Sequence, residues 1–261
     1  RLIINNLNII MKNKISVTII CKNEASRIKR CLDSVCWADE IVIVDSGSTD
    51  DTLAVVAEYT DKIFINTDWQ GFGKQKKLAA DKATNNWILS IDSDEVVSSE
   101  LHDEIFSLID SLDERTVYRL NRLTNFCNKF IRHSGWHPDR IVRLYNKKHY
   151  QYSDALVHES VACKGAKTID LKGKLLHYTC DTLEIYMDKR NNYAKAWAKG
   201  QFEKGRKVSV IGIMAHVLVA FIRHYILRLG FLDGYHGFLI SVIQMQYTFN
   251  KYNFLRCKNI T

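Results

Sequence analysis

The sequence predicts an α/β fold: a doubly wound mixed sheet followed by a helical C-terminal extension. Three observations support this prediction. Short β-branched runs alternate with segments of helical spacing over residues 15–91, a pattern typical of parallel strands joined by helices. Polar residues follow the carboxyl ends of these runs, where open α/β sheets bind their ligands. Residues 183–261 repeat apolar helical patterns and carry no catalytic motif.

Four strands and three helices are expected in the first half. The strands are short and β-branched, as buried strands are, and lie at residues 15–20, 41–44, 62–65 and 87–91. The helices place apolar residues on one face and lie at residues 24–36, 52–59 and 74–83. Residues 48–51 (Ser-Thr-Asp-Asp) resemble a capping box at the start of the second helix.

The second half is less regular. Its expected elements are a helix at 99–109, strands at 117–126 and 141–145, a helix from 183, and apolar helical stretches at 208–229 and 234–252. We therefore divide the chain into an N-terminal extension (1–14), a catalytic domain (15–180) and a helical region (181–261).

The composition restricts the class of protein. The 261 residues include 37 Lys and Arg against 29 Asp and Glu, a net charge of +8, which favours an anionic partner. Seven cysteines show neither a CxxC pair nor zinc-ligand spacing, so we expect reduced thiols and a cytoplasmic protein. Basic residues are scattered and no RNA-binding aromatic motif occurs, which argues against nucleic acid as the partner.

The N-terminal residues 1–10 lack the cleavage site of a signal peptide, and Met11 resembles a natural start. We therefore treat residues 1–10 as an upstream extension. No run reaches the roughly 18–20 apolar residues of a membrane span. The nearest is 208–222, which His216 interrupts.

The strand at 87–91 leads into Asp92-Ser93-Asp94-Glu95. Because side chains alternate along a strand, we expect the carboxylates of Asp92 and Asp94 to point to one side. Two convergent carboxylates are costly unless a cation neutralises them. Mg²⁺ or Mn²⁺ with a diphosphate fits this need, since both cations prefer oxygen ligands.

The first two strands also end in polar residues. The first ends in Cys21-Lys-Asn23-Glu24, and no glycine occurs between residues 1 and 46. A dinucleotide site would need a glycine-rich turn there, so an NAD site is unfavourable. The second strand ends at Asp45, whose carboxylate could accept the imino N–H of a uracil ring.

A glycine pair precedes the third helix, in Gly71-Phe-Gly73-Lys-Gln-Lys76-Lys77. Cations at a helix N-terminus oppose the helix dipole. A bound anion such as a diphosphate would offset that cost.

In this order, the motifs resemble the nucleotide-binding half of GT-A glycosyltransferases of family 2, over residues 15–180. By that resemblance, the nucleotide-sugar ligands are Cys21, Asn23, Glu24, Asp45, Gly71, Lys76, Asp92 and Ser93. Two positions depart from the family pattern: Ser46 replaces a second Asp, and Lys77 stands where relatives often carry Asn.

A second set of motifs narrows the resemblance. They are residues 132–140 (RHSGWHPDR), 143–146 (RLYN), 157–159 (VHE), 176–177 (LH), 230–234 (GFLDG) and 237–238 (GF). This set is similar to bacterial lipopolysaccharide and lipooligosaccharide inner-core β-glucosyltransferases of the heptose β-1,4-glucosyltransferase type. The resemblance implies inverting transfer of a hexose, glucose, from a UDP-sugar to a heptose of a lipid-anchored core oligosaccharide.

The resemblance also implies roles near the reacting atoms. Glu159 is the expected general base, and Asp94 is expected to hold Mn²⁺ or Mg²⁺. His177 is expected to be a further metal ligand, with His158 as its competitor. Trp136, His158 and Arg143 are expected to contact the acceptor, and Gly135 and Asp139 lie in the same expected acceptor loop.

The C-terminal stretch 208–229 is apolar with basic residues around it, which suits a helix in an anionic membrane interface. The alternative is an apolar face buried in a homodimer or against the catalytic domain. A lipid-anchored acceptor favours a peripheral location on the cytoplasmic face of the inner membrane.

Parts of the sequence are also compatible with three other functions. The motif at Asp92 also resembles the nucleophile strand of haloacid-dehalogenase-type phosphohydrolases, but that family carries it on the first strand. An inactive, nucleotide-binding transferase homologue is the second alternative, and a basic nucleic-acid or membrane-binding module is the third.

Overall fold

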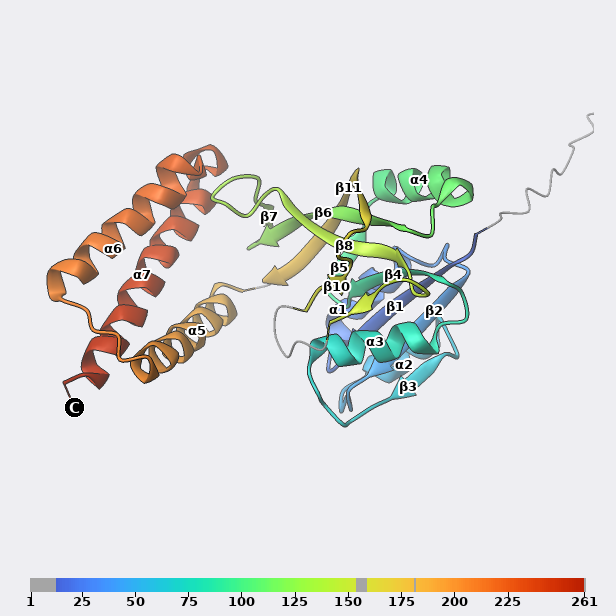
Figure 1. Cartoon of the computed structure of the whole chain (residues 1–261), viewed down its shortest axis with the longest axis horizontal. Coiled ribbons are helices and arrows are strands. Elements are labelled where there is room, and N and C mark those ends of the chain that lie inside the picture. The colour runs from blue at the N-terminus through green and yellow to red at the C-terminus, as the bar shows by residue number, and fades with distance from the viewer. Residues whose placement is uncertain (1–12, 154–158, 181, 261) are drawn as a thin grey trace, which may run out of the picture. The chain divides into compact units, whose positions relative to one another are not determined.

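The computed structural model describes residues 13–153, 159–180 and 182–260 (Figure 1). The first elements in chain order are β1 (Ile15–Cys21), α1 (Ala25–Asp33), β2 (Glu40–Asp45), α2 (Thr52–Ala57), β3 (Ile63–Ile65), α3 (Phe72–Lys82) and β4 (Trp87–Asp92). Next come β5 (Glu95–Val97), α4 (Ser99–Leu108), η1 (Ile109–Ser111), β6 (Thr116–Phe126), β7 (Lys129–Phe130), β8 (Asp139–Asn146), β9 (Gln151–Tyr152), β10 (Val161–Ala162) and β11 (Lys167–Cys180). The last are α5 (Leu183–Glu203), α6 (Val210–Ile222), the π-helical turn η2 (Arg223–Leu227), the 3-10 turn η3 (Gly230–Asp233) and α7 (Tyr235–Lys258).

The main sheet has the strand order β3-β2-β1-β4-β8-β6-β11-β5, with β7 paired to β6. Strands β1 to β4 are parallel, whereas β8 is antiparallel to β4. In this register Cys21 lies beside Asp45, and Ile20 lies beside Asp92. The polar residues that follow β1, β2 and β4 therefore share the carboxyl edge of the sheet, as the sequence predicts.

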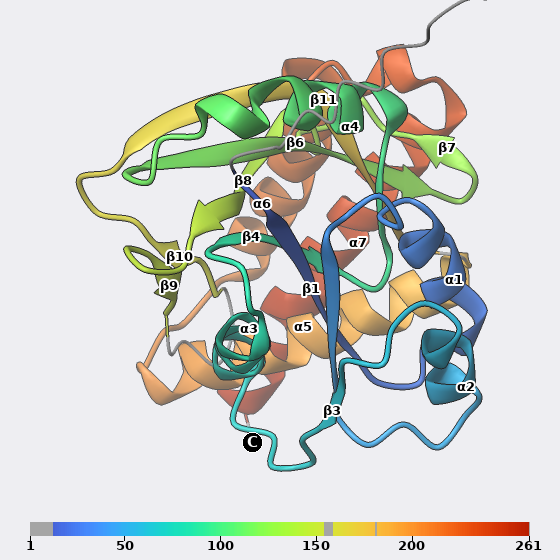
Figure 2. The same ribbon diagram turned by 90° about the vertical axis from the view of Figure 1, so that its right-hand side faces the viewer.

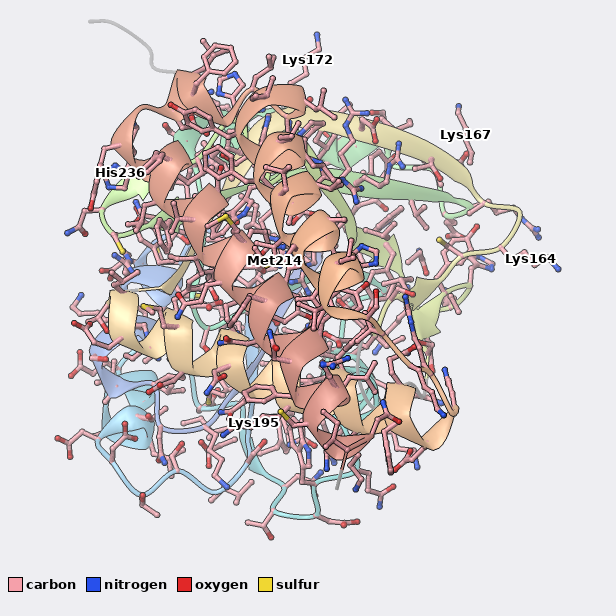
Figure 3. All side chains as sticks on the ribbon, turned by 90° about the vertical axis from the view of Figure 1, so that its left-hand side faces the viewer. Lys164, Lys167, Lys172, Lys195, Met214 and His236 are labelled. Atoms are coloured by element: carbon pink, nitrogen blue, oxygen red, sulfur yellow. The ribbon has the colours of Figure 1, made fainter. Side chains whose placement is uncertain are left out.

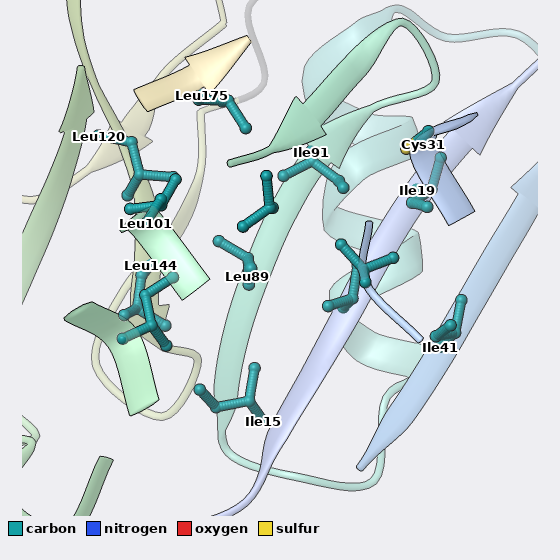
Figure 4. Packing of buried hydrophobic residues seen from close by; sticks show 14 of the residues in the cluster. Ile15, Ile19, Cys31, Ile41, Leu89, Ile91, Leu101, Leu120, Leu144 and Leu175 are labelled. Carbon is teal, nitrogen blue, oxygen red and sulfur yellow. The ribbon is translucent and has the colours of Figure 1, made fainter. Parts of the chain in front are cut away.

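Helices pack on both faces of the parallel strands (Figure 2). On one face, Val17 and Ile19 of β1 share a buried cluster with residues of α1, α2 and α4, and Figure 4 shows Ile19 with Cys31 of α1. On the other face, Ile20 and Val44 pack against Ala79 of α3. This arrangement confirms the predicted doubly wound mixed sheet with a helical C-terminal region.

Three local predictions need correction. The first helix ends at Asp33 rather than Cys36, and the second ends at Ala57. The predicted capping box does not form: the N-cap residue Asp51 makes no side-chain cap hydrogen bond, and the Ser48 hydroxyl bonds instead to Asp45 and to the backbone of Asn23. The 14-residue strand β11 was not predicted.

The described residues form two compact units. One takes its residues from 1–122 and 140–176, and the other from 123–139 and 177–261. The segment 123–139 thus groups with the C-terminal helices, although it falls within the range expected for the catalytic domain. In this second unit α6 and α7 run side by side, with Met214 on α6 (Figure 3).

One helical path, Val210–Leu227, is long and apolar enough to cross a membrane by length and composition. The sequence pattern did not predict this, because His216 interrupts the apolar run 208–222 and Arg223 and His224 follow it. The helix nevertheless continues through them as η2.

Cys21, Cys31, Cys36 and Cys163 are free thiols. Cys21 and Cys31 are buried, whereas Cys36 and Cys257 are exposed. Burial raises the pKa of the Cys31 thiol well above its ordinary value, so this thiol stays protonated at neutral pH.

Candidate active site

The loops after β1 and β2 are joined by hydrogen bonds at the carboxyl edge of the sheet. Asn23 has a left-handed backbone, with φ of 56°. Its N–H donates to Ser48 Oγ at 2.8 Å, and its side-chain oxygen accepts from the Thr49 N–H at 2.8 Å. The Glu24 N–H donates to Thr52 Oγ1 at 2.8 Å. These bonds hold Asn23 and Glu24, two predicted nucleotide ligands, at the crevice edge.

Asp45 lies fully buried under these loops. One carboxylate oxygen accepts from the N–H groups of Gly47 and Ser48, both at 2.8 Å, and the other accepts from the Ser48 hydroxyl and the Cys21 thiol. Burial and the Asp45 charge raise the pKa of Cys21, so its thiol is a donor. A uracil imino group would reach Asp45 only by displacing one of these donors.

Helix α3 begins after Gly71, whose φ of 104° favours glycine. Buried Gln75 then bonds two loops: its amide donates to Ser46 Oγ at 2.9 Å, and its carbonyl accepts from the Asn66 amide at 2.7 Å. Gln75 was not predicted as a site residue, because the burial of a polar residue depends on partners remote in sequence.

Lys76 is a buried cation between two carboxylates of the site. Its ammonium lies 2.8 Å from Asp92 Oδ1 and 2.8 Å from Glu159 Oε1, and 5.4 Å from the centre of the Tyr152 ring. Burial and Arg143 lower the pKa of Lys76, but Asp92 and Glu159 outweigh them and raise it. The structure thus brings together three predicted site residues, joined by a buried positive charge.

Arg143 supports the same carboxylate from the other side. Its guanidinium donates to Asp92 Oδ2, to Glu95 Oε1 at 2.9 Å and to the Tyr152 hydroxyl at 3.1 Å. Burial alone would raise the pKa of Asp92, but Arg143 and Lys76 hold it well below its usual range. Asp92 is therefore ionised at neutral pH.

Strand β4 ends at Asp92, and residues 93 and 94 form a turn before β5. The strand alternation used to place Asp92 and Asp94 on one side therefore does not extend to Asp94. The adjacent Glu95 is fully buried, and its other oxygen accepts from the Asp92 N–H at 2.9 Å. Glu95 was not among the predicted site residues, although it directly follows the predicted acid pair.

The predicted metal ligands come from both units. His177 lies on β11 in the second unit, where its Nδ1 is 3.3 Å from Thr124 Oγ1. His158 lies outside the described residues. Within residues 13–153, 159–180 and 182–260, no group of three or more His, Cys, Asp or Glu side chains could hold a metal ion.

The predicted acceptor loop is fixed by the C-terminal segment of its own unit. The buried Asp233 carboxylate accepts from the N–H groups of Arg132 and His133, at 3.2 and 2.8 Å, and contacts the His133 ring at 3.2 Å. The Ser134 N–H donates to the Arg228 carbonyl at 2.9 Å. Two motifs that are about 100 residues apart in sequence therefore form one structural element.

Trp136, from the same loop, is half-buried and packs against Phe126 and Tyr186, with ring centres 5.5 and 5.8 Å apart. Gly135 has a φ of 77°, and a Cβ there would lie 2.1 Å from the Arg228 side chain. The loop conformation thus depends on glycine at this position.

Residues 16–166 match the sequence profile of glycosyl transferase family 2. The chain belongs to this family and is a glycosyltransferase. An uncharacterized glycosyltransferase of Rickettsia felis is 34% identical over 243 residues, covering 88% of this chain and 85% of the relative. The lipopolysaccharide core biosynthesis glycosyltransferase LpsC of Rhizobium meliloti is 28% identical over 250 residues, covering 92% and 91%.

A solved structure extends the likeness to the fold. The mannosyltransferase PcManGT from Pyrobaculum calidifontis, in complex with GDP-Man and Mn²⁺, has a TM-score of 0.57 at 12% identity, covering 93% of this chain and 87% of its own. The family match and this likeness together confirm the predicted GT-A-type fold. They leave no support for the phosphohydrolase alternative, whose expected nucleophile Asp92 is ion-paired to Lys76 and Arg143.

Proposed function

We propose that this glycosyltransferase transfers a hexose, glucose in our interpretation, from a UDP-sugar to a heptose of the lipopolysaccharide or lipooligosaccharide core. The observation that carries the proposal is the contact of Lys76 with both Asp92 and Glu159. It joins a group expected to contact the donor with the expected general base. LpsC supports the core acceptor, because its name assigns it to lipopolysaccharide core biosynthesis.

The donor contacts proposed from the family resemblance are grouped by the fold of the first unit. Asn23 and Glu24 follow β1, Asp45 ends β2, and Asp92 ends β4, all at the carboxyl edge of parallel strands. This is the edge at which open α/β sheets bind nucleotides. Cys21, Gly71, Lys76 and Ser93 complete the proposed donor site.

We propose that the donor site also binds a divalent cation, which the substrate diphosphate shares. Asp94 offers hard oxygen donors beside this edge, and a cation bound to a diphosphate needs only one or two carboxylates from the protein. We propose Asp94 as the main ligand of Mn²⁺ or Mg²⁺. The further ligand His177 is predicted by the family resemblance alone. Such a cation would stabilise negative charge on the leaving UDP. PcManGT, solved with GDP-Man and Mn²⁺, supports a metal of this class.

The proposed reaction is a single inverting displacement. The acceptor oxygen forms a bond to the anomeric carbon while the bond from that carbon to the UDP oxygen breaks. Glu159 takes the proton of the acceptor hydroxyl. Lys76 holds Glu159 and Asp92 in place, and its charge also suits the diphosphate that leaves. Trp136, His158 and Arg143 remain proposed acceptor contacts.

We also propose that the second unit binds the cytoplasmic face of the inner membrane. Large exposed apolar side chains gather on α6, η2, η3 and the start of α7: Val210, Ile211, Met214, Leu218, Val219, Ile226, Leu227, Leu229, Phe231, Leu232, Tyr235 and Phe238. We call this set the apolar face. Residues 204–261 contain eight Lys and Arg but one acid, the buried Asp233. Apolar area with a basic surround fits anionic lipid.

The donor site is tested first by thermal denaturation with UDP, GDP, CMP and NAD, each with and without Mn²⁺. We expect UDP to raise the melting temperature only with Mn²⁺, because a ligand that binds the native state stabilises it. Asp94→Asn should abolish the part of this rise in melting temperature that depends on Mn²⁺. If UDP with Mn²⁺ has no effect on the wild type, the donor assignment is wrong, and an inactive homologue becomes the better interpretation.

Membrane binding is tested by flotation with vesicles of neutral lipid, with and without anionic phosphatidylglycerol. We expect wild type to float with the anionic vesicles, and Ile211→Glu with Met214→Glu to remain unbound. The control is Phe106→Glu on α4, which also removes an exposed aromatic side chain. If the wild type stays unbound and forms a dimer that the double variant lacks, the apolar face is a homodimer interface instead.

A further inference from the structure

A cavity of about 510 Å³ lies beside the proposed base in the first unit. Asp92 and Glu159 line it together with four arginines, Arg119, Arg122, Arg140 and Arg143. The arginines come from β6 and β8, which are neighbours in the sheet, and β8 is also the neighbour of β4. The arginines that line the cavity therefore lie on β8, the neighbour of the strand that ends in Asp92, and on β6 beyond it.

Two of these arginines, Arg119 and Arg140, share one carboxylate, that of Asp170. Arg119 makes a two-pronged contact with Asp170, Nε to Oδ1 at 2.6 Å and an Nη to Oδ2 at 3.0 Å. Arg140 shares the same carboxylate at 3.2 Å. The side chains of Arg119 and Arg140 remain 39% and 48% exposed. One carboxylate cannot use the donors of two guanidinium groups, each with five N–H bonds.

A pair of guanidinium groups with spare donors is suited to an oxyanion. The planar fork of arginine matches phosphate and carboxylate oxygens in a bidentate manner. A purely structural ion pair with Asp170 would need one arginine. The second arginine, Arg140, therefore adds positive charge that this carboxylate does not balance.

The location of the pair favours the acceptor over the donor. Arg119 and Arg140 line a cavity with Asp92 and with Glu159, the group proposed to receive the acceptor proton. Their strands β6 and β8 lie on the opposite side of β4 from β1 and β2 in the sheet. The donor diphosphate is instead proposed at the edge of β1, β2 and β4, next to Lys76. An anion bound at Arg119 and Arg140 would thus belong to the molecule whose hydroxyl meets Glu159.

We infer that the acceptor is an anionic sugar, and that Arg119 and Arg140 bind a phosphate or carboxylate group which it carries near the attacked hydroxyl. This inference rests on the proposed function, because it assigns the cavity to the acceptor. Beyond the proposed function, it specifies that the acceptor is negatively charged and that Arg119 and Arg140 select for that charge.

The test is a titration by ligand-observed NMR with three probes: glucose 6-phosphate, glucuronic acid and glucose. Saturating UDP and Mn²⁺ occupy the donor site throughout, and UDP binding is measured separately. We expect wild type to bind at least one anionic probe roughly tenfold more tightly than glucose. The stronger of the two anionic probes identifies the group as a phosphate or a carboxylate.

Matched variants separate anion binding from other effects. Arg119→Gln with Arg140→Gln should lose the preference, whereas Lys167→Gln with Lys172→Gln removes the same charge from exposed side chains of β11 (Figure 3) and should keep it. Asp170→Asn should bind the anionic probe as tightly as wild type or more so, since it releases both guanidinium groups.

The inference is overturned if wild type shows no preference for either anion, or if both double variants lose it equally. It is also overturned if Asp170→Asn fails as Arg119→Gln with Arg140→Gln does, because the arginines then act only through their structural pair. A failure of wild type to bind UDP would instead count against the proposed donor site, while the probe titrations would still report on the arginines.

Discussion

Lys76 and Glu159, 83 residues apart in sequence, form an ion pair of 2.8 Å inside the first unit. The same ammonium holds Asp92, so one lysine fixes two carboxylates that would otherwise repel each other. The arrival of a diphosphate would offer Lys76 a third anionic partner. A diphosphate that pairs with this ammonium would weaken the ion pair between Lys76 and Glu159. Donor binding would then release the carboxylate of the proposed base.

Glu159→Gln should retain the fold and the donor site but lose turnover. The amide can still accept a hydrogen bond from Lys76, whereas it cannot take the acceptor proton. We expect kcat to fall by about 10²- to 10⁴-fold, the usual contribution of a general base. Steady-state kinetics with UDP binding measured in parallel test this. The control is Glu114→Gln, an exposed carboxylate, and an unchanged kcat for Glu159→Gln would exclude the base role.

Arg143→Lys should destabilise the first unit although it conserves charge. A lysine ammonium cannot reach Asp92, Glu95 and the Tyr152 hydroxyl at once, because it lacks the planar fork of arginine. We expect the free energy of unfolding to fall by about 2 kcal/mol, the size of one or two lost charged hydrogen bonds. Urea denaturation measures it. An equal loss for Arg115→Lys, at an exposed position, would contradict this role.

Glu40, at the start of β2, should contribute stability that disappears in acid. Its buried carboxylate contacts Ser16 and Lys62 and accepts from the Thr84 N–H and hydroxyl at 2.8 and 2.9 Å. Burial raises the pKa of Glu40, but Lys62, Ser16 and Thr84 lower it more, from 4.5 to about 2. The folded state therefore gains stability above pH 4.5 and loses it as pH falls toward 2.

We expect Glu40→Gln to cost about 2 to 3 kcal/mol at pH 7, and the difference from wild type to shrink between about pH 5 and pH 2. Denaturation at a series of pH values measures both quantities. Glu58→Gln, on an exposed side chain, is the control and should match wild type at every pH. A difference for Glu40→Gln that stays constant with pH would rule out this linkage.

Gly237→Ala and Gly200→Ala should have opposite effects on the second unit. A Cβ at Gly237, in α7, would lie 1.8 Å from the carbonyl oxygen of Gly230, so the segments must separate. A Cβ at Gly200, inside α5, meets no described atom within 4 Å. We expect Gly200→Ala to stabilise by about 0.5 to 1 kcal/mol and Gly237→Ala to lower the melting temperature. Equal changes in melting temperature for the two variants would refute the close packing at Gly237.

The sequence was sufficient for the parallel strands, because β-branched runs and the polar residues after them depend on local pattern. It was insufficient for β11. The alternation of Ile169, Leu171 and Leu175 with polar residues is present, but Gly173 interrupts it. A Cβ at Gly173 would lie 2.3 Å from the Leu101 Cα, so this glycine permits α4 to pack closely. A close contact between segments that are remote in sequence leaves no recognisable pattern in the local sequence.

The candidate site likewise combines residues that local motifs predict with residues that only the tertiary structure brings in. Lys76, Asp92 and Glu159 could be selected in advance because each stands in a recognisable motif. Arg143 was selected for the acceptor, yet in the structure it binds the Asp92 and Glu95 carboxylates. Its partner Glu95 was missed, because only the antiparallel pairing of β8 with β4 places an arginine beside it.

The distribution of thiols makes the protein suited to distance measurements by fluorescence. Cys36 is exposed in the first unit and Cys257 in the second, while Cys21 and Cys31 are buried with raised thiol pKa values. Thiolates are the reactive species toward maleimide dyes, so the two exposed positions should label first. With the other three cysteines replaced by serine, a dye on each unit would allow the distance between the two dyes to be measured with and without donor and acceptor.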